Sequence, residues 1–407
     1  MTSALIEKIL SNKISDQSFA LLYRPSSTGI NRIEILVGEV YELDTLNSIP
    51  LPKLSDTSIH NNALLVLIPY KQLKERNFDY IDDDATLMVM KVTHYETISM
   101  TEAFRILPHL AIKLSEGVFD ISDDSYIEIV KKIIAEEIGG GEGSNFVIKR
   151  QITADIADYS IKSALSIFYG LIKNEMNAYW TFLIHTKHRT LIGASPELHV
   201  SLKKNSVRMN PISGTYRYPV SGPTLEGIMN FLSTSKEADE LYMVVEEELK
   251  MLARLCPLGG KIIGPFLKEM SQLAHTEYFI EGKSTCDPIT ILRETMFAPT
   301  VTGSPIENAC RIIAKYESKG RGYYSGIATL IGTDLGGYTL DSSILIRTAD
   351  INREGFVQIG IGATIVRHSD PLMEVAETKA KAKALLQAMQ AKEIISVQRA
   401  FNSTTSA

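Results

Sequence analysis

The stretch that decides the fold class lies at residues 324–366 and reads YSGIATLIGTDLGGYTLDSSILIRTADINREGFVQIGIGATIV. It contains β-rich segments at 324–332, 337–346 and 355–366, and a helix is expected only after the third of them, at 371–389. Strands and helices mix in this way throughout the chain, without a regular strand–helix–strand alternation. We therefore predict an α+β fold in which large antiparallel β-sheets form a sandwich flanked by helices.

Further elements follow from hydrophobic spacing and turn residues. Runs rich in Ile, Leu and Val predict strands at 18–23, 32–43, 63–69, 86–93, 145–152, 178–185, 190–194 and 198–202. Helices are expected at 157–173 and 235–255, near Pro305, and after an N-cap offered by Asp123, Asp124 and Ser125. We divide the chain into a strand-rich N-terminal subdomain (1–110), a main domain (111–392) and a C-terminal tail (393–407).

Composition excludes several classes of protein. The chain has 48 acidic and 42 basic residues, a net charge of -6, which argues against nucleic-acid binding. It has no run of 18 apolar residues for a membrane span, and its first residues are too polar for a secretory signal. Three scattered cysteines favour neither a disulfide framework nor a zinc site. We expect a cytoplasmic protein.

Two pairs of glutamates share one spacing. Glu237 and Glu240 are three residues apart on one predicted helix, and Glu374 and Glu377 are three apart on another. Side chains at this spacing share a helix face. If the two faces met, they would form an oxygen-only site suited to Mg²⁺. The alternative is that both are solvated helix faces.

Other candidates remain open at this point. The glycine-rich run at 139–143 lacks the Lys-Ser/Thr of a phosphate-binding loop, and no GxSxG motif marks a serine hydrolase. By itself, a single histidine such as His275 is more often a packed or surface residue than a catalytic one. Arg347, at the end of an apolar strand, needs an anion, either a substrate carboxylate or a structural acid. Lys381 lies one turn beyond Glu377 and could instead be a solubilising residue.

Taken together, these segments resemble the chorismate-utilising enzymes, such as anthranilate synthase component I, aminodeoxychorismate synthase and isochorismate synthase. The resemblance spans about residues 143–388, and its motifs stand in the family's order. They are ASPE at 194–197, PISGT at 211–215, KEADE at 236–240, His275, TVTGSP at 300–305, GYYSG at 322–326, LD at 340–341 through Arg347, and GAT at 362–364 through Glu374, Glu377 and Lys381.

The resemblance implies a role for each residue. Glu197 matches the general acid that protonates the departing C4 hydroxyl of chorismate, and His275 and Thr300 match residues around the ring. Glu240 and Glu377, supported by Glu237 and Glu374, match the ligands of a Mg²⁺ ion that holds the ring carboxylate. Six further residues match those that bind the second, enolpyruvyl carboxylate and the wall around it: Tyr324, Arg347, Gly362, Ala363, Thr364 and Lys381.

The nucleophile side distinguishes members of the family. Members that add water carry a lysine base at the position that is Asn145 here. An amide is not a base, whereas ammonia is already nucleophilic and needs only a hydrogen-bonding guide. The resemblance therefore implies amination at C2. Lys149, four residues further on, would come closer only through a slip in register.

The departures from anthranilate synthase favour a specific product. Residues 246–251 read EEELKM where the family's Asp-Leu-x-Arg-Asn-Asp is usual, and Thr364 replaces a glycine. These features resemble the 2-amino-2-deoxyisochorismate synthases of phenazine and enediyne pathways, which serve antibiotic and other secondary-metabolite biosynthesis and retain the enolpyruvyl group. Anthranilate synthase component I, which releases pyruvate, and isochorismate synthase are the alternatives within the family. A non-catalytic regulator is the alternative outside it.

The remaining expectations concern partners. With no nucleophile-elbow cysteine after the last predicted helix, we expect ammonia to come from a separate glutamine amidotransferase subunit or from solution. Chorismate and ammonia are the expected substrates, Mg²⁺ the expected cofactor, and a homodimer the assembly considered.

Overall fold

A computed structural model describes residues 4–11, 17–54, 63–175, 177–219, 221–233, 235–269 and 273–390, without the side chains of 215, 217 and 235–241. Its strands are β1 (Ser18–Tyr23), β2 (Arg32–Leu43), β3 (Leu64–Ile68), β4 (Leu87–Ser99), β5 (Val118–Phe119), β6 (Asn145–Asp155), β7 (Trp180–His185), β8 (Arg189–Ser195), β9 (Leu198–Lys203), β10 (Ser206–Met209), β11 (Ile212–Arg217), β12 (Gly260–Glu269), β13 (Leu273–Lys283), β14 (Gly303–Ser304), β15 (Ile327–Asp334), β16 (Gly337–Ile344), β17 (Thr348–Asn352) and β18 (Phe356–Val366). Its α-helices are α1 (Ala4–Leu10), α2 (Pro25–Thr28), α3 (Met100–Ile106), α4 (Asp123–Lys132), α5 (Ile161–Asn174), α6 (Leu225–Leu232), α7 (Ser235–Leu255), α8 (Pro288–Thr295), α9 (Ile306–Tyr316) and α10 (Pro371–Met389).

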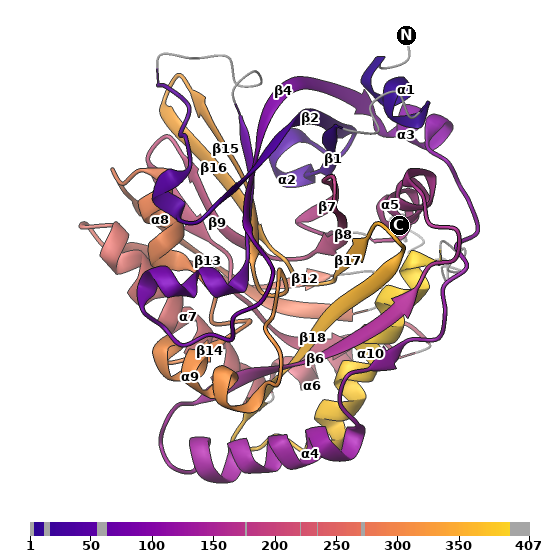
Figure 1. Ribbon diagram of the computed structural model, residues 1–407. Coiled ribbons are helices and arrows are strands. Elements are labelled where there is room, and N and C mark those ends of the chain that lie inside the picture. The colour runs from indigo at the N-terminus through magenta and orange to yellow at the C-terminus, as the bar shows by residue number, and fades with distance from the viewer. Residues whose placement is uncertain are drawn as a thin grey trace, which may run out of the picture.

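The strands form one continuous sheet, and every pairing between the described strands is antiparallel. One half runs from β12 through β13, β10, β9, β16 and β15 to β3. The long strand β4 pairs with both β3 and β2, and the other half continues through β1, β7, β8, β17 and β18 to β6. The predicted α+β fold with a large antiparallel sheet is confirmed (Figure 1).

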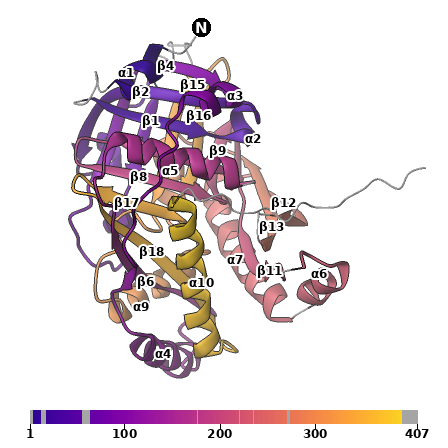
Figure 2. The same ribbon diagram turned by 90° about the vertical axis from the view of Figure 1, so that its right-hand side faces the viewer.

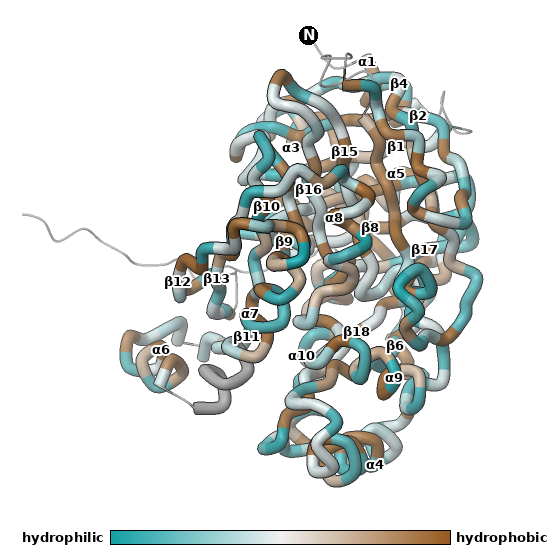
Figure 3. The backbone as a smooth tube through the Cα atoms, turned by 90° about the vertical axis from the view of Figure 1, so that its left-hand side faces the viewer, coloured by the Kyte–Doolittle hydropathy of each residue, from teal (hydrophilic) through white to brown (hydrophobic). Residues whose placement is uncertain are grey.

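Three apolar layers hold this sheet together. The two halves face each other across an inner core that contains Trp180, Phe182 and Met90. Outside one half, α7, α8 and α9 bury a second core, and outside the other half α5 and α10 bury a third. Figure 1 shows these two groups of helices on opposite sides of the sheet, and Figure 3 shows hydrophobic residues running through the strands between them. This arrangement is the predicted sandwich flanked by helices.

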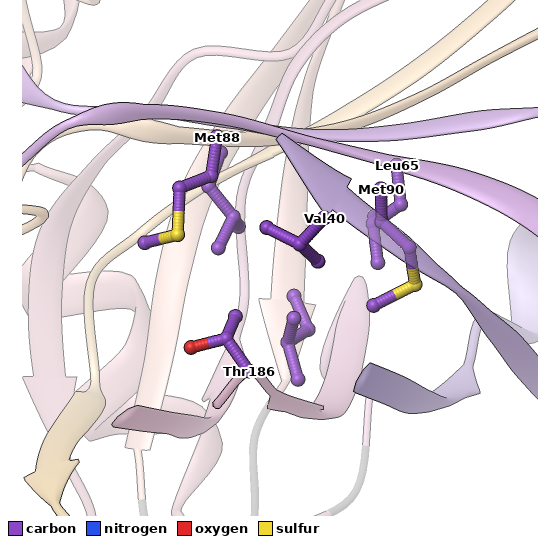
Figure 4. Close-up of a pocket in the computed structure, with 7 residues that line it drawn as sticks. Val40, Leu65, Met88, Met90 and Thr186 are labelled. Carbon is purple, nitrogen blue, oxygen red and sulfur yellow. The ribbon is translucent and has the colours of Figure 1, made fainter. Parts of the chain in front are cut away.

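The inner core is closely packed. A cavity of about 10 Å³ lies between Val40, Met88 and Met90 on one side and Thr186 on the other (Figure 4). A cavity needs roughly 10–15 Å³ to hold a single water molecule. The interior of the sandwich therefore has no room there for a small-molecule effector.

Several predicted elements coincide with the observed ones. The predicted strands 18–23 and 32–43 and helices 235–255 and 371–389 match β1, β2, α7 and α10. The predicted N-cap of α4 at Asp123, Asp124 or Ser125 was wrong. The N-cap is Ser122, whose hydroxyl accepts the hydrogen bond from the backbone N–H of Ser125. The predicted tail lies outside the described residues, and the division at residue 110 stays a prediction.

The sequence did not predict β12 and β13, which form an arm with β11 and α6. Figure 2 shows this arm standing out from the rest of the molecule beside α7. The pair Gly264-Pro265 in the middle of β12 suggests a turn, and the structure accommodates it as an irregularity between Ile263 and Phe266. Proline is tolerated there because β12 is an edge strand, where a missing N–H interrupts no central ladder.

All three cysteines are free thiols. None of the described helices is long and apolar enough to cross a bilayer.

Candidate active site

Glu197 lies in the tight connection between β8 and β9, and hydrogen bonds fix its backbone. Its N–H donates to the Ser195 hydroxyl (3.4 Å), and its carbonyl oxygen accepts from the N–H of Ile344 (3.3 Å). Its side chain is 2% exposed, and the Thr300 hydroxyl donates to Oε1 (2.7 Å). The two residues are 103 positions apart in sequence, and the fold brings them into contact.

The surroundings of Glu197 determine its protonation state. Burial raises the pKa of its carboxyl to about 8, and the Thr300 hydrogen bond and the charge of Lys268 offset only part of that rise. A carboxyl with such a pKa carries its proton at neutral pH and can donate it. The geometry thus equips Glu197 for the acid role that the resemblance implies.

His275 on β13 contacts Arg347, which follows β16. The Nδ1–H of His275 donates to the carbonyl oxygen of Gly214 (2.7 Å), which leaves Nε2 to accept from Nη2 of Arg347 (3.0 Å). Burial, followed by the charge of Arg347, lowers the pKa of His275 to about 3. The imidazole is therefore neutral and orients the guanidinium.

Arg347 forms no ion pair within the part of the chain that the structure describes, although the carboxyls of Glu175 and Glu197 are near enough to act on its pKa. Burial is the largest effect and lowers the pKa of its guanidinium. Its backbone adopts a left-handed conformation (φ 51°) just beyond β16, so it lies in the connection to β17 and not at the strand end that the sequence predicted. A buried guanidinium beside a neutral histidine favours an anion as ligand.

Tyr324 packs against glycines of β18. A Cβ on Gly360 would overlap the Tyr324 ring, and one on Gly362 would overlap its hydroxyl. Only glycine permits this close approach. Lys381 on α10 donates from Nζ to the carbonyl oxygen of Gly362 (2.9 Å) and pairs with Glu377 (2.7 Å). Burial acts to lower the pKa of Lys381, but the carboxylate of Glu377 outweighs it, so the pKa is raised.

The other two residues predicted on this wall lie next to Gly362. Ala363 is buried on β18 and pairs with Ile148, and Thr364 pairs with Val147. The predicted substrate-binding residues thus come together from β18, α10, and the turns before β15 and after β16.

Asn145 begins β6 and is completely buried. Its backbone pairs with Ser304 on one side and Val366 on the other. Its Nδ2 has no hydrogen-bond partner among the described residues, and Oδ1 accepts only a long bond from the Ser144 hydroxyl (3.4 Å). A buried amide left unsatisfied in this way is suited to a ligand.

Lys149 does not take the place of Asn145. Its Nζ donates to the carbonyl oxygen of Gly320 (2.8 Å), and burial lowers its pKa. In the β6–β18 register Lys149 lies opposite Gly362, four residues from the Asn145–Val366 pair. The register slip considered from the sequence does not occur.

Two of the four predicted metal-binding acids are described. Glu374 is 3% exposed in the first turn of α10, and Glu377 lies one turn later beside Lys381. The side chains of Glu237 and Glu240 lie outside the described residues, although α7, which carries them, begins at Ser235. Within the described part of the chain no three candidate ligands are grouped around a point.

The donors nevertheless fit Mg²⁺ in kind, because carboxylate oxygens are the ligands that it prefers. Negative charge also concentrates near α10. Burial strongly raises the pKa of the Tyr126 hydroxyl, and the carboxylates of Glu374 and Glu377 raise it further.

Two further buried polar groups fall inside motifs already quoted from the sequence, although neither was predicted to have a role. Glu248 on α7 is 2% exposed, its Oε2 has no partner among the described residues, and burial together with Glu197 raises its pKa well above normal. Helical spacing could have identified it, because it falls one turn from the buried residues Val244 and Leu252. Ser213 on β11 likewise has a buried hydroxyl without a described partner.

Arg321 was also missed. Its guanidinium donates to the carbonyl oxygens of Val147 and Val301 (both 2.7 Å), forms an ion pair with Glu317 (2.6 Å) and lies 5.5 Å from the Tyr324 ring centre. It joins β6, the Thr300 loop and Tyr324, and so supports three parts of the site at once.

The comparisons with known proteins agree with this geometry. A family model described as chorismate binding enzyme matches residues 93–387. The phenazine-specific anthranilate synthase of Pseudomonas chlororaphis is 56% identical over 389 residues, which cover 95% of this chain and 60% of that protein. The corresponding protein of Pseudomonas fluorescens is 54% identical, with the same coverage. The chain thus spans about 60% of the length of these relatives.

Solved structures share the fold at low sequence identity. An isochorismate synthase of Bacillus anthracis, described as specific for 2,3-dihydroxybenzoate, superposes with a TM-score of 0.73 at 22% identity, over 95% of this chain and 100% of that one. Anthranilate synthase component I of Streptococcus pneumoniae superposes with a TM-score of 0.69 at 19% identity, over 90% and 92% of the two chains.

Proposed function

The chain belongs to the chorismate-binding enzyme family, and from this we propose that it aminates chorismate at C2 with loss of the C4 hydroxyl. The product would be 2-amino-2-deoxyisochorismate. We assign this activity to residues 111–392, with Mg²⁺ as cofactor, in the cytoplasm. Ammonia would come from a separate glutamine amidotransferase or from solution, and a homodimer is the assembly we consider.

The observation that carries this proposal is the buried carboxyl of Glu197, whose pKa burial raises to about 8 and whose Oε1 accepts a hydrogen bond from Thr300. Hydroxide is a poor leaving group, so C–O cleavage at neutral pH needs a positioned acid. With a pKa of about 8, Glu197 has its proton available, and the Thr300 hydroxyl donates to Oε1, which leaves the protonated oxygen to the substrate.

Arg347 and Lys381 suit the two negative charges of chorismate. Arg347 forms no ion pair with a described acid, and a planar guanidinium can bind a carboxylate through two parallel hydrogen bonds. We assign the enolpyruvyl carboxylate to Arg347, with Tyr324 and the backbone of Gly362, Ala363 and Thr364 beside it. Fixing both ends of the substrate would hold C4 against Glu197.

Glu240, Glu377, Glu237 and Glu374 would hold the Mg²⁺ ion. When bound, the ion would supply positive charge to the ring carboxylate. Lys381 and Glu377 form an ion pair (2.7 Å), so a cation and a carboxylate lie side by side at this end of α10. The lysine would face a substrate carboxylate and the glutamate would face the metal ion, which supports placing the anionic substrate here.

Asn145 supports ammonia over water as the nucleophile. The family members that add water are those with a lysine base at this position; here an amide replaces it, and Lys149 is bonded to the carbonyl oxygen of Gly320. Ammonia has a lone pair ready and needs only orientation. In the proposed step the ammonia nitrogen bonds to C2, the ring double bonds shift, the C4–O bond breaks, and Glu197 protonates the departing oxygen to give water.

A second candidate is anthranilate synthase activity, which the names of both Pseudomonas relatives favour. It differs by elimination of pyruvate after amination. The test is to incubate the protein with chorismate, Mg²⁺ and ammonium and to identify the product by mass spectrometry, with pyruvate followed through lactate dehydrogenase. We expect an amine product that retains the enolpyruvyl group. Pyruvate equal to the chorismate consumed would support the second candidate, and turnover without ammonium would contradict both.

A further inference from the structure

A buried carboxylate of α7 contacts the strand that pairs with Asn145. Glu247 on α7 is 7% exposed, and its Oε2 accepts a hydrogen bond from the Ser304 hydroxyl (3.3 Å). Ser304 on β14 is the direct antiparallel partner of Asn145 on β6. Side chains of directly opposed residues lie on the same face of a sheet, so the Ser304 hydroxyl that donates to Glu247 lies on the same face as the amide of Asn145.

That face of β6 is the substrate face. Alternate residues of a strand share a face, which places Asn145 on the same side as Val147. The Val147 side chain packs 2.7 Å from where a Cβ on Gly362 would stand, next to the Tyr324 hydroxyl. The strand pairing therefore places a hydroxyl that is bonded to a buried carboxylate on the same face as a carboxamide, at the nucleophile end of the candidate active site.

The charge at Glu247 is only weakly balanced. Lys250 pairs with the neighbouring Glu246 at 2.9 Å and approaches Glu247 only to 3.6 Å, from the solvent side, with its own side chain 58% exposed. A mostly buried carboxylate whose paired cation sits on an exposed lysine side chain still gains from a second positive charge on its buried side. The Asn145 amide, with one polar atom unsatisfied, offers a further contact to such a ligand.

We propose that Glu247, Ser304 and Asn145 form a subsite that binds ammonium and supplies ammonia to C2 of chorismate. This inference rests on the proposed function. In the step, ammonium gives one proton to the Glu247 carboxylate and becomes ammonia, whose nitrogen then bonds to C2 as the C4 oxygen leaves with the proton of Glu197. Glu247 releases its proton to solvent and Glu197 regains one, so the cycle consumes one ammonium and releases one water.

The test is the dependence of the initial rate on ammonium chloride, at saturating chorismate and constant total salt. Loss of a charge-assisted hydrogen bond in Glu247→Gln should raise the KM for ammonium about 10- to 100-fold. The KM for chorismate should stay at the wild-type value. Ser304→Ala, which keeps the carboxylate, should raise the KM for ammonium about three- to tenfold, and it serves if Glu247→Gln does not fold.

The matched control is Glu246→Gln, one residue earlier on α7, where the carboxylate is 69% exposed and also pairs with Lys250. It should leave both KM values unchanged. An unchanged KM for ammonium in Glu247→Gln and Ser304→Ala would overturn the subsite, and so would equal rises in both KM values. A wild-type protein that does not consume chorismate with ammonium would refute the proposed function itself.

Discussion

At the scale of single residues, environment gives ordinary side chains their chemistry. Glu197 is one of 48 acidic residues, yet burial raises its pKa to about 8. The same effect acts in the opposite direction on His275, where burial lowers the pKa to about 3. Burial disfavours the charged form in both, which keeps the acid protonated and the imidazole neutral.

The pH dependence of activity should follow Glu197. Because the proposed step uses the protonated form of Glu197, whose pKa is raised from 4.5 to about 8, activity should hold through neutral pH and fall as the pH rises through 8. The folded state gains from the same proton below pH 4.5 and loses that contribution as the pH rises through 8. The measurement is kcat for chorismate consumption against pH.

Glu197→Gln should lower kcat roughly 100- to 10,000-fold, because a positioned acid contributes about that factor. Glu354→Gln removes an exposed carboxylate and should behave as wild type. A wild-type kcat in Glu197→Gln would remove the acid role.

At the scale of elements, local signals fix where helices begin, and long-range packing fixes what they support. Ser160 caps α5 by accepting from the N–H of Ser163, while the Ser163 hydroxyl accepts from the N–H of Ser160. The buried face of α5 packs on β7 and β8, and β8 leads into Glu197. The cap therefore contributes to the layer behind the acid without contacting the site.

Ser160→Ala should lower the free energy of unfolding by about 1 kcal/mol, the usual cost of losing an N-cap. The measurement is chemical denaturation followed by circular dichroism. Ser221→Ala changes an exposed serine in the turn before α6, outside any helix cap, and serves as the control with wild-type stability. Equal stability of Ser160→Ala and wild type would show that the cap contributes nothing.

At the scale of the whole molecule, the proposed metal site needs acids from two helices that are far apart in sequence. Removal of divalent ions with EDTA should abolish turnover of chorismate, and added Mg²⁺ should restore it, because the ring carboxylate would lose its counter-charge. The measurement is chorismate consumption before and after dialysis. Full turnover in excess EDTA would contradict a role for the ion.

The acid on α10 can be tested separately. Glu374→Gln should raise the Mg²⁺ concentration needed for half-maximal activity about tenfold or more, since a carboxylate near the ion is replaced by a neutral amide. Glu307→Gln, an exposed acid on α9, should leave that concentration unchanged. The same requirement in both variants would remove Glu374 from the site.

The sequence alone determined the elements with strong local signals. The bounds of α7, α10, β1 and β2 follow from hydrophobic spacing and from stop and start residues, which depend only on neighbours in the chain. The order of the family motifs likewise needs no coordinates. The sequence did not predict the edge strand β12, because the pair Gly264-Pro265 usually indicates a turn. The pairing with β13 that accommodates these two residues can be seen only in the fold.

Only the tertiary structure decided which side chains meet and which are buried. Glu197 contacts Thr300 across 103 residues, and His275 contacts Arg347 across 72. Ser304 and Asn145 become neighbours through strand pairing, and the packing of α7 against β14 brings Glu247 to Ser304. Desolvation depends on everything packed around a group. The raised pKa of Glu197 and the unsatisfied amide of Asn145 therefore depend on the tertiary structure and cannot be predicted from residue spacing along the chain.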